Sequence, residues 1–440
     1  MLSPIAEALA EGIVGLLFGT LKGVGRVILE AGKWVATIWG KIKYDKDKNG
    51  VPEVSIMLNP IHISLIAPTR AGKTTLLSTV MKDAETALPA PFKVRAKSRE
   101  DEIRVDRLNN KITQAIGNGT LIDEAIKGSA EITEYNYEIV YEHTHEIAPS
   151  GKKPAEQLRF TVTQPFNLMD IPGGWLDVEN RPEGEWRRFT EHLHKSVALW
   201  VPVDAPILME SRDMDGQIGG IAAGILKIAK VQDIVVNEWA KYRTYRHEQW
   251  AQQRALGHEQ EEHEPAAVLC LAPLKCETYF SQAEDPSVKY AFKGEFIKRY
   301  GALVDAVKGE CAFSEIYYTP VESIGCIKLQ GVEWNADSGN PAVSYKIVNP
   351  PRKISGADAL TAGVYRYGAA CIAEAVGKER KKWEDELKHR APLTILIDLF
   401  GKGKAKKEQL RAMNEVLDTL QRASVTLQSL ADRAKNTGKL

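Results

Sequence analysis

The strongest constraint on the fold lies in residues 61–77, where an apolar run is followed by a tight loop and the start of a helix. The loop closes in Gly72-Lys73-Thr74. A Gly-Lys-Thr that follows a strand and opens a helix is the context of a phosphate-binding loop, because backbone N–H groups at the helix N-terminus hold a β-phosphate. We expect Lys73 to reach the β/γ oxygens and the Thr74 hydroxyl to bind Mg²⁺.

The whole loop is expected to contact a nucleotide, through Ala67, Pro68, Thr69, Arg70, Ala71, Gly72, Lys73, Thr74 and Thr75. Ala67 stands where the first Gly of the motif is expected. Its methyl group is tolerated there only if the turn keeps φ negative. The alternative interpretation is a chance Gly-Lys-Thr at an ordinary strand–helix turn.

A second phosphate motif, Asp170-Ile-Pro-Gly173, stands at the end of another apolar run. An Asp at the carboxyl end of a strand beside the phosphate loop can hold Mg²⁺ through water, and the Gly173 N–H can sense the γ-phosphate. Asp-x-x-Gly alone is usually a turn. Its position after Gly-Lys-Thr, at the end of a buried strand, favours the phosphate function.

Apolar runs and helical patterns alternate from residue 52 to residue 330. This pattern indicates an α/β fold with a mostly parallel P-loop NTPase sheet flanked by helices, whose ligand lies at the carboxyl ends of the strands. The expected strands are residues 54–58, 61–66, 131–141, 158–163, 166–170, 197–205, 266–277 and 314–325. The expected helices include 101–116 and 184–195, with a helical insertion at about 214–264. We interpret Asp204 as structural, with a role near the metal as the alternative.

A helical extension, residues 1–48, is expected to precede this domain. Its glycines fall at spacings of four on one helix face, where another helix can approach closely: Gly15, Gly19 and Gly23. Trp34 and Trp39 lie among lysines, as residues at a lipid headgroup boundary do. For residues 5–42 the alternatives are contact with a membrane surface, packing against the body or a partner chain, and a true span. The absence of an uninterrupted apolar run of about 20 residues disfavours the span.

A second helical extension, residues 350–440, is expected to follow the domain. Its apolar patch at 393–400 is followed by a basic spacer at 401–407 and a final amphipathic helix. We interpret these helices as packing on the core or pairing between protomers. Contact with a membrane surface through Phe400 and the following lysines is the alternative.

Composition restricts the functional classes. The 440 residues include 58 basic and 58 acidic ones, and this balance gives no indication of a nucleic-acid partner. No Cys-x-x-Cys pair occurs, so the cysteines are interpreted as reduced thiols. The pairs His143/His145 and His192/His194 lack a matching carboxylate or Cys cluster, so no metal site is expected there. No secretory signal is convincing, and we expect a cytoplasmic protein, with peripheral association with the inner membrane as the alternative.

Four motifs occur in order, each after an apolar strand: the loop 67–74, Asp170-x-Pro-Gly173, Lys275-Cys-Glu277 and Ser323-Ile-Gly325. Together they resemble the motif series of the GTPase superclass of P-loop proteins. The two phosphate motifs look most like bacterial stress-type and double-GTPase-like proteins, including the YcjX group. The resemblance covers about residues 55–330 and implies binding of GTP with Mg²⁺, and a bacterial origin.

The resemblance also implies a base site. In that family the Lys of the third motif packs on guanine, and an Asp accepts from N1 and N2. Here these roles would fall to Lys275 and Glu277, with a backbone N–H near Ser323 or Gly325 at the base oxygen. The extra methylene of Glu277 shifts its reach, and Leu274 cannot tie this loop to the phosphate loop. GTP is favoured, and ATP or relaxed specificity remains open.

The residues for hydrolysis are the least defined. The switch Thr that would cap Mg²⁺ is not fixed by spacing, and Thr133 is the first choice with Thr120 as its rival. Small GTPases position the attacking water with a Gln just after Asp-x-x-Gly, where this chain has Gly174. Arg70 can stabilise charge at the phosphates, or it points to solvent or pairs with an acid. We therefore expect slow turnover, with activation by a partner or by self-association.

Three functional hypotheses follow. The first is a GTP-hydrolysing switch whose γ-phosphate contacts change the display of the terminal helices. The second is an ATPase of a related P-loop branch. The third is a scaffold or membrane effector in which the bound nucleotide is structural.

Overall fold

The computed structural model describes residues 40–46, 52–73, 75–77, 80, 92–117, 131–147, 156–257, 265–280, 286–334 and 341–348, with single positions at 364, 367, 418, 421, 422, 425 and 429. Thr74, Thr120 and most of the two terminal extensions therefore lie outside the described residues. The chain divides into two compact units. Unit 1 comprises residues 1–59, 140–164 and 368–426, and unit 2 comprises residues 60–139, 165–367 and 427–440.

In unit 1, two strands form an antiparallel pair, β1 (Gly40–Lys46) and β2 (Pro52–Leu58). β2 also pairs in parallel with the first part of β6 (Glu156–Asp170). The prediction of helix up to residue 48 is therefore wrong for residues 40–46. Residues 41–44 read Lys-Ile-Lys-Tyr, a polar–apolar alternation with the period of a strand.

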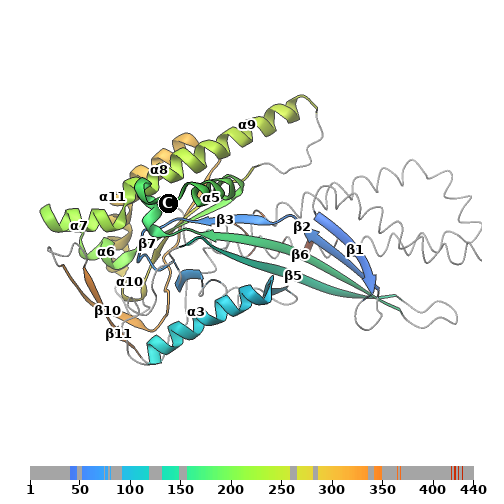
Figure 1. Ribbon diagram of the computed structural model, residues 1–440, viewed down its shortest axis with the longest axis horizontal. Helices are drawn as coiled ribbons and strands as arrows, with labels where there is room; N and C mark the ends of the chain where they lie inside the picture. Colours follow the sequence, from blue (N-terminus) through green and yellow to red (C-terminus); the bar gives the residue numbers. More distant parts are fainter. Residues whose placement is uncertain are drawn as a thin grey trace, which may run out of the picture. The chain divides into compact units, whose positions relative to one another are not determined.

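In unit 2, the end of β6 and four further strands form a parallel series in the order β6–β3–β7–β8–β9, of which β6, β3 and β7 are labelled in Figure 1. These strands are β3 (Ile61–Leu65), β7 (Ala198–Asp204), β8 (Val268–Leu274) and β9 (Glu315–Tyr318). The prediction of a mixed α/β fold with a mostly parallel sheet is confirmed. Because the strands are parallel, their carboxyl ends meet at one edge of the sheet.

Further strands lie beside this series. β5 (Thr133–Ile147) pairs with β6 and with β4 (Phe92–Ala96). A separate antiparallel pair, β10 (Ile327–Glu333) and β11 (Ala342–Ile347), was not predicted.

β6 is one long strand, although the sequence suggested two, at 158–163 and 166–170. Pro165 does not break it, because β6 changes neighbours at this point: Thr163 is the last residue paired with β2, and Phe166 is the first paired with β3. A proline is tolerated in a strand where no ladder hydrogen bond is needed from its nitrogen. Where β6 changes from β2 to β3 as its neighbour, the Gln164 side chain donates to the Asn59 carbonyl at 2.8 Å.

Unit 2 also contains helices. They are α3 (Arg99–Gly117), α5 (Glu183–Lys195), α6 (Ala205–Glu210), α7 (Gly216–Leu226), α8 (Ile228–Asp233), the π-helical η3 (Ile234–Ala240), α9 (Lys241–Ala255), α10 (Glu277–Phe280) and α11 (Pro286–Glu310). The predicted insertion at 214–264 is thus helical in its described part. It is broken at Lys227, whose left-handed φ of 43° ends α7. Of the helices of unit 2, α5 contacts β3 and α6 contacts β7.

The core of unit 2 lies between the sheet and these helices. All seven residues of β7 are buried, and Trp239 of η3 is fully buried with its indole N–H donating to the Ser196 carbonyl at 3.0 Å. Phe189 of α5 and Phe296 of α11 belong to the same cluster. Each such side chain contributes about 1.5–3 kcal/mol by burial. The sheet is therefore a rigid base for the loops at its carboxyl edge.

No helix within the described residues has the length and apolar character needed to cross a membrane. The predicted contact of residues 5–42 with a membrane surface or a partner concerns residues 5–39, which lie outside the described residues, and residues 40–42 at the start of β1. The seven single positions described after residue 348 are helical, and the helical extension over residues 350–440 stays a prediction.

Candidate nucleotide site

The loop after β3 turns sharply before the next helix begins. The Ala71 N–H donates to the Pro68 carbonyl at 3.4 Å, and the Leu76 N–H donates to the Gly72 carbonyl at 2.9 Å, which opens the helix. Arg70 and Gly72 both have left-handed backbones, with φ of 68° and 88°. Such alternation in a short loop turns successive N–H groups toward one side, the arrangement of an anion-binding nest.

The side chains of this loop divide by exposure. Ala67, Pro68 and Ala71 are buried, whereas Thr69 and Arg70 are exposed; Thr75, in the helix, is buried. Ala67 is not among the residues with positive φ, so the condition for a methyl group at that position is met. The exposed Arg70 side chain keeps its proposed role at the phosphates as a prediction.

Lys73 and Asp170 converge from neighbouring strands. The Lys73 Nζ lies 3.2 Å from Asp170 Oδ1, and it also donates to the carbonyls of Ala67, at 3.3 Å, and of Ile171. β3 and β6 are adjacent and parallel, with Leu65 opposite Asp170, so this meeting follows from the sheet itself. The Gly-Lys-Thr loop and the Asp-x-x-Gly motif therefore lie next to each other at the carboxyl edge of the sheet.

Asp170 has the features of a metal-binding carboxylate. It is buried, and burial raises its pKa more than the nearby Lys73 lowers it. Oδ1 lies 3.2 Å from Lys73 Nζ and has no further partner among the described residues. A buried carboxylate oxygen of this kind fits a Mg²⁺ ion or its water, because oxygen is the ligand that Mg²⁺ prefers. The other expected ligand, Thr74, lies outside the described residues.

Gly173 touches the phosphate loop directly. A Cβ at this position would lie 2.1 Å from the Thr69 nitrogen and 2.5 Å from the Pro68 carbonyl carbon. Only glycine allows the two backbones to approach this closely. At Gly174, by contrast, an added Cβ would meet no atom within 4 Å. The two motifs are thus in contact through Gly173, while the next position is open.

The segment after Gly173 is held by contacts that no sequence motif signals. Arg181 donates to the Trp175 carbonyl at 2.8 Å and stacks 3.9 Å over the ring of Trp186. Asp177 pairs with Lys227 and Lys230, at the junction of α7 and α8. Hydrogen bonds from these two lysines lower the pKa of Asp177. The segment that follows the Asp-x-x-Gly motif is therefore tied to the helical insertion.

Lys275 links the third motif to the phosphate loop. Its Nζ donates to the Arg70 carbonyl at 3.2 Å and pairs with Asp204 Oδ2 at 3.0 Å. Its own N–H donates to Ser323 Oγ at 2.9 Å. Asp204 also caps α6, because its Oδ1 accepts from the Ile207 N–H at 3.1 Å. The lysine thus supplies the tie to the phosphate loop that Leu274 lacks.

Glu277 contacts the fourth motif instead of facing it across an open gap. Its Oε1 accepts from the backbone N–H groups of Ile324 at 2.7 Å and Gly325 at 3.1 Å. Its Oε2 is buried and receives no hydrogen bond from the described residues. Burial, the largest influence, raises the pKa of Glu277 to about 7, although these N–H groups lower it.

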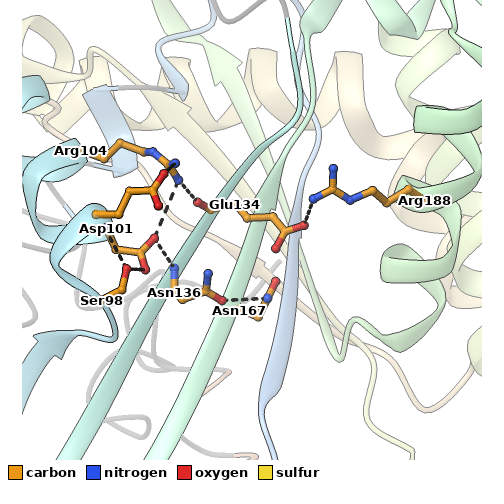
Figure 2. Close-up of polar contacts among 8 residues, drawn as sticks. Ser98, Asp101, Arg104, Glu134, Asn136, Asn167 and Arg188 are labelled. Carbon is orange, nitrogen blue, oxygen red and sulfur yellow. Dashed lines mark hydrogen bonds and ion pairs between the residues drawn. The ribbon is translucent and has the colours of Figure 1, made fainter.

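Thr133 begins β5, next to a polar cluster shown in Figure 2. The adjacent Glu134 accepts from Arg104 of α3 through its carbonyl and from Arg188 of α5 through its carboxylate. One strand further, the Asn167 amide donates to the Asn136 side-chain oxygen at 2.9 Å, which fixes the start of β5 against the end of β6. Thr133 therefore begins the strand next to the one that ends in Asp170, and its role as the switch residue stays a prediction.

The two histidines of α5 have partners of their own. His192 is buried, contacts Ser64 Oγ at 3.1 Å and Asn167 Oδ1 at 2.8 Å, and burial lowers its pKa to about 3. His194 stacks on Tyr242 at 3.9 Å. Both act as packing groups in the described part of the chain.

No family model matches the chain, and no curated protein matches it in sequence. Among solved structures, the chain is similar to the GTPase-like domain of S. cerevisiae Ski7, which was solved bound to GTP, with 11% identity and a TM-score of 0.25. The match covers 60% of this chain, and the chain spans 42% of the length of that structure. The sequence identity and the TM-score are both too low to indicate a shared architecture or ligand, so the candidate nucleotide site rests on the contacts within this chain alone.

Proposed function

We propose that the chain is a nucleotide-dependent switch that binds a nucleoside triphosphate with Mg²⁺ and hydrolyses it slowly. The observation that carries the proposal is the meeting of Lys73 and Asp170, 3.2 Å apart, beside a loop with the backbone of an anion nest. A structural ion pair alone would not need the left-handed residues Arg70 and Gly72 next to it.

In this function, the loop N–H groups and the helix N-terminus bind the phosphates, and Lys73 exchanges its carbonyl partners for phosphate oxygens. Asp170, with Thr74, would hold Mg²⁺, which neutralises charge on the phosphates when bound. Gly173 places its backbone against Thr69, so a group at the γ-phosphate position affects both loops. Thr133 is proposed as the residue that senses this group from β5.

Slow hydrolysis follows from Gly174. This residue has no side chain to orient an attacking water, and the space around it is open among the described atoms. Arg70, exposed in the phosphate loop, is proposed as the cation that stabilises charge during transfer. An activating partner would act by filling the space beside Gly174.

The partner side of the proposal concerns the terminal extensions. Association with a protein partner, with a second copy or with a membrane surface through residues 5–42 remains a prediction. Co-sedimentation with anionic liposomes of the full chain, compared with a chain that begins near residue 45, tests it. Equal sedimentation of the two chains would remove the membrane role.

Phosphate release and calorimetric titration with GTP and ATP, with and without Mg²⁺, test the central proposal. Asp170→Asn is expected to abolish Mg²⁺-dependent hydrolysis while keeping the shape of the side chain, and Lys73→Ala to abolish triphosphate binding. Lys195→Ala, which removes an exposed lysine at the end of α5, is the matched control and is expected to behave as wild type. Absence of triphosphate binding by the folded wild-type chain would overturn the proposal. Loss of turnover without loss of cellular activity in Lys73→Ala would favour the scaffold hypothesis.

A further inference from the structure

The base side of the site differs from the expectation for guanine in the number of available hydrogen-bonding groups. Reading guanine takes two acceptors, for N1–H and the N2 amino group, and one donor for the O6 oxygen. Glu277 was expected to supply both acceptors, and a backbone N–H of the fourth motif to supply the donor.

In the structure these groups are paired with each other. Glu277 Oε1 accepts at once from the Ile324 N–H, at 2.7 Å, and from the Gly325 N–H, at 3.1 Å. One carboxylate oxygen and two backbone donors are therefore already used within the protein. Only Oε2 remains without a hydrogen bond among the described residues.

The contacts explain why glutamate is present. Its additional methylene carries the carboxylate from the first residue of α10 as far as the backbone of the loop at residues 323–325. The Lys275 N–H bond to Ser323 Oγ, at 2.9 Å, fastens the same loop from the other side. Both hydrogen bonds to Oε1 are available whether or not the carboxyl group is ionised, because Oε1 acts only as their acceptor. Glu277 is thus a clamp between the third and fourth motifs.

We infer that this clamp leaves the site with little selection for guanine, so that it binds purine nucleoside triphosphates with similar affinity. The inference rests on the proposed function and names its substrate class. The binding energy comes from the phosphate half, through the nest and Lys73. Glu277 Oε2, which is buried and has no hydrogen bond among the described residues, leaves at most one acceptor for a base, and both the adenine and the guanine edge offer at least one N–H donor.

The discrimination expected from this arrangement is small. Sites that hydrogen-bond every polar group of a substrate reject analogues by about 10⁴–10⁵-fold, because the analogue leaves buried groups of the protein unpaired. Here Glu277 Oε1 and the N–H groups of Ile324 and Gly325 stay paired with each other whichever base enters. We therefore expect dissociation constants for GTP, ATP and inosine triphosphate, which lacks the N2 amino group, to agree within about tenfold.

Calorimetric titration of the full chain with these three nucleotides, and with inorganic triphosphate as a probe without a base, tests the inference. Agreement of the three nucleotides within tenfold supports it, and a preference for GTP beyond tenfold overturns it. If neither the nucleotides nor inorganic triphosphate bind, the proposed function itself fails. Failure of the inference about base selection, which shows as a preference for GTP, is therefore distinguishable from failure of the proposed function.

Glu277→Asp gives the second test. Its shorter side chain withdraws the carboxylate from Ile324 and Gly325 and so frees both oxygens and both donors. We expect the ratio of GTP to ATP affinity to rise at least tenfold, with inorganic triphosphate binding unchanged. Glu322→Asp, which shortens the neighbouring acid, is the matched control. An unchanged ratio in a folded Glu277→Asp variant, shown by thermal unfolding and intact triphosphate binding, would refute the role of the clamp.

Discussion

The contact between Gly173 and the phosphate loop makes a sharp prediction. In Gly173→Ala, the new Cβ would stand 2.1 Å from the Thr69 nitrogen and 2.7 Å from the Thr69 Cα. These are backbone atoms, which cannot rotate away as a flexible side chain does. The two loops must therefore move apart by about 1 Å to restore ordinary van der Waals contact.

The cost of that movement can be worked out. Overpacking by one methyl group in a close-packed site costs typically 1–3 kcal/mol, and a contact with backbone on both sides falls toward the upper end. We expect Gly173→Ala to lower the free energy of unfolding by about 2–3 kcal/mol. Displacement of Thr69 also disturbs the anion nest, so triphosphate affinity is expected to fall at least tenfold, or about 1.4 kcal/mol.

Gly174→Ala is the matched control, because its Cβ meets no atom within 4 Å. Denaturant unfolding of both variants, with titration of inorganic triphosphate, measures the two effects separately. The control is expected to stay within about 0.5 kcal/mol of wild type, as surface substitutions usually do. If Gly173→Ala unfolds and binds triphosphate as the control does, the two phosphate motifs are not in contact, and the proposed coupling between them is wrong.

Four further predictions concern the same site. Arg70→Gly is expected to stabilise the fold by up to ~1 kcal/mol, because relief of about 1–2 kcal/mol of left-handed backbone strain outweighs the larger conformational entropy that glycine loses on folding. The same change is expected to lower turnover at least tenfold. Denaturant unfolding measures the first effect, and phosphate release measures the second. Gly174→Gln places a water-orienting amide in open space and is expected to raise single-turnover hydrolysis above wild type. Burial raises the pKa of Glu277 from 4.5 to about 7, so the stability that this group contributes is present below pH 4.5 and is lost as pH rises through 7. The loss is on the order of 3 kcal/mol. Glu277→Gln is expected to remove this pH dependence of stability, measured as the difference between the denaturation midpoints at pH 5 and pH 8. Asp177→Asn removes the charge partner of Lys227 and is expected to speed proteolysis of the segment after Gly173 at low salt, with a smaller difference at about 1 M salt.

The sequence was sufficient to predict that Lys73 and Asp170 lie together at one edge of the sheet. Gly72-Lys73 and Asp170 follow apolar runs, and parallel strands bring the ends of such runs to one edge. The order of strands was not readable, because apolar runs that are buried on both faces carry no signal of their neighbours. That β3 lies directly beside β6 came from the structure.

Other features of the structure were not predicted from the sequence, for identifiable reasons. β1 was hidden because its lysines were interpreted as part of a basic helical segment, although residues 41–44 alternate. Pro165 suggested a break in β6, and the change of pairing partner that tolerates it depends on tertiary structure. The Asp177–Lys227 pair joins residues 50 positions apart, and no local pattern marks it.

Glu277 shows why the base half was the harder one to predict. At the level of residue type, a Glu in place of Asp keeps the charge and both acceptors, and the substitution looks conservative. The length of the side chain decides which groups remain for a base. The one added methylene brings the carboxylate to the Ile324 and Gly325 N–H groups, which then donate to Glu277 and not to a base. The phosphate half depends on backbone geometry and on a Lys–Asp pair, neither of which changes with this length. In the proposed function, recognition of the triphosphate and recognition of the base are therefore separable, and variants of Glu277 are expected to alter nucleotide choice without altering the affinity for inorganic triphosphate.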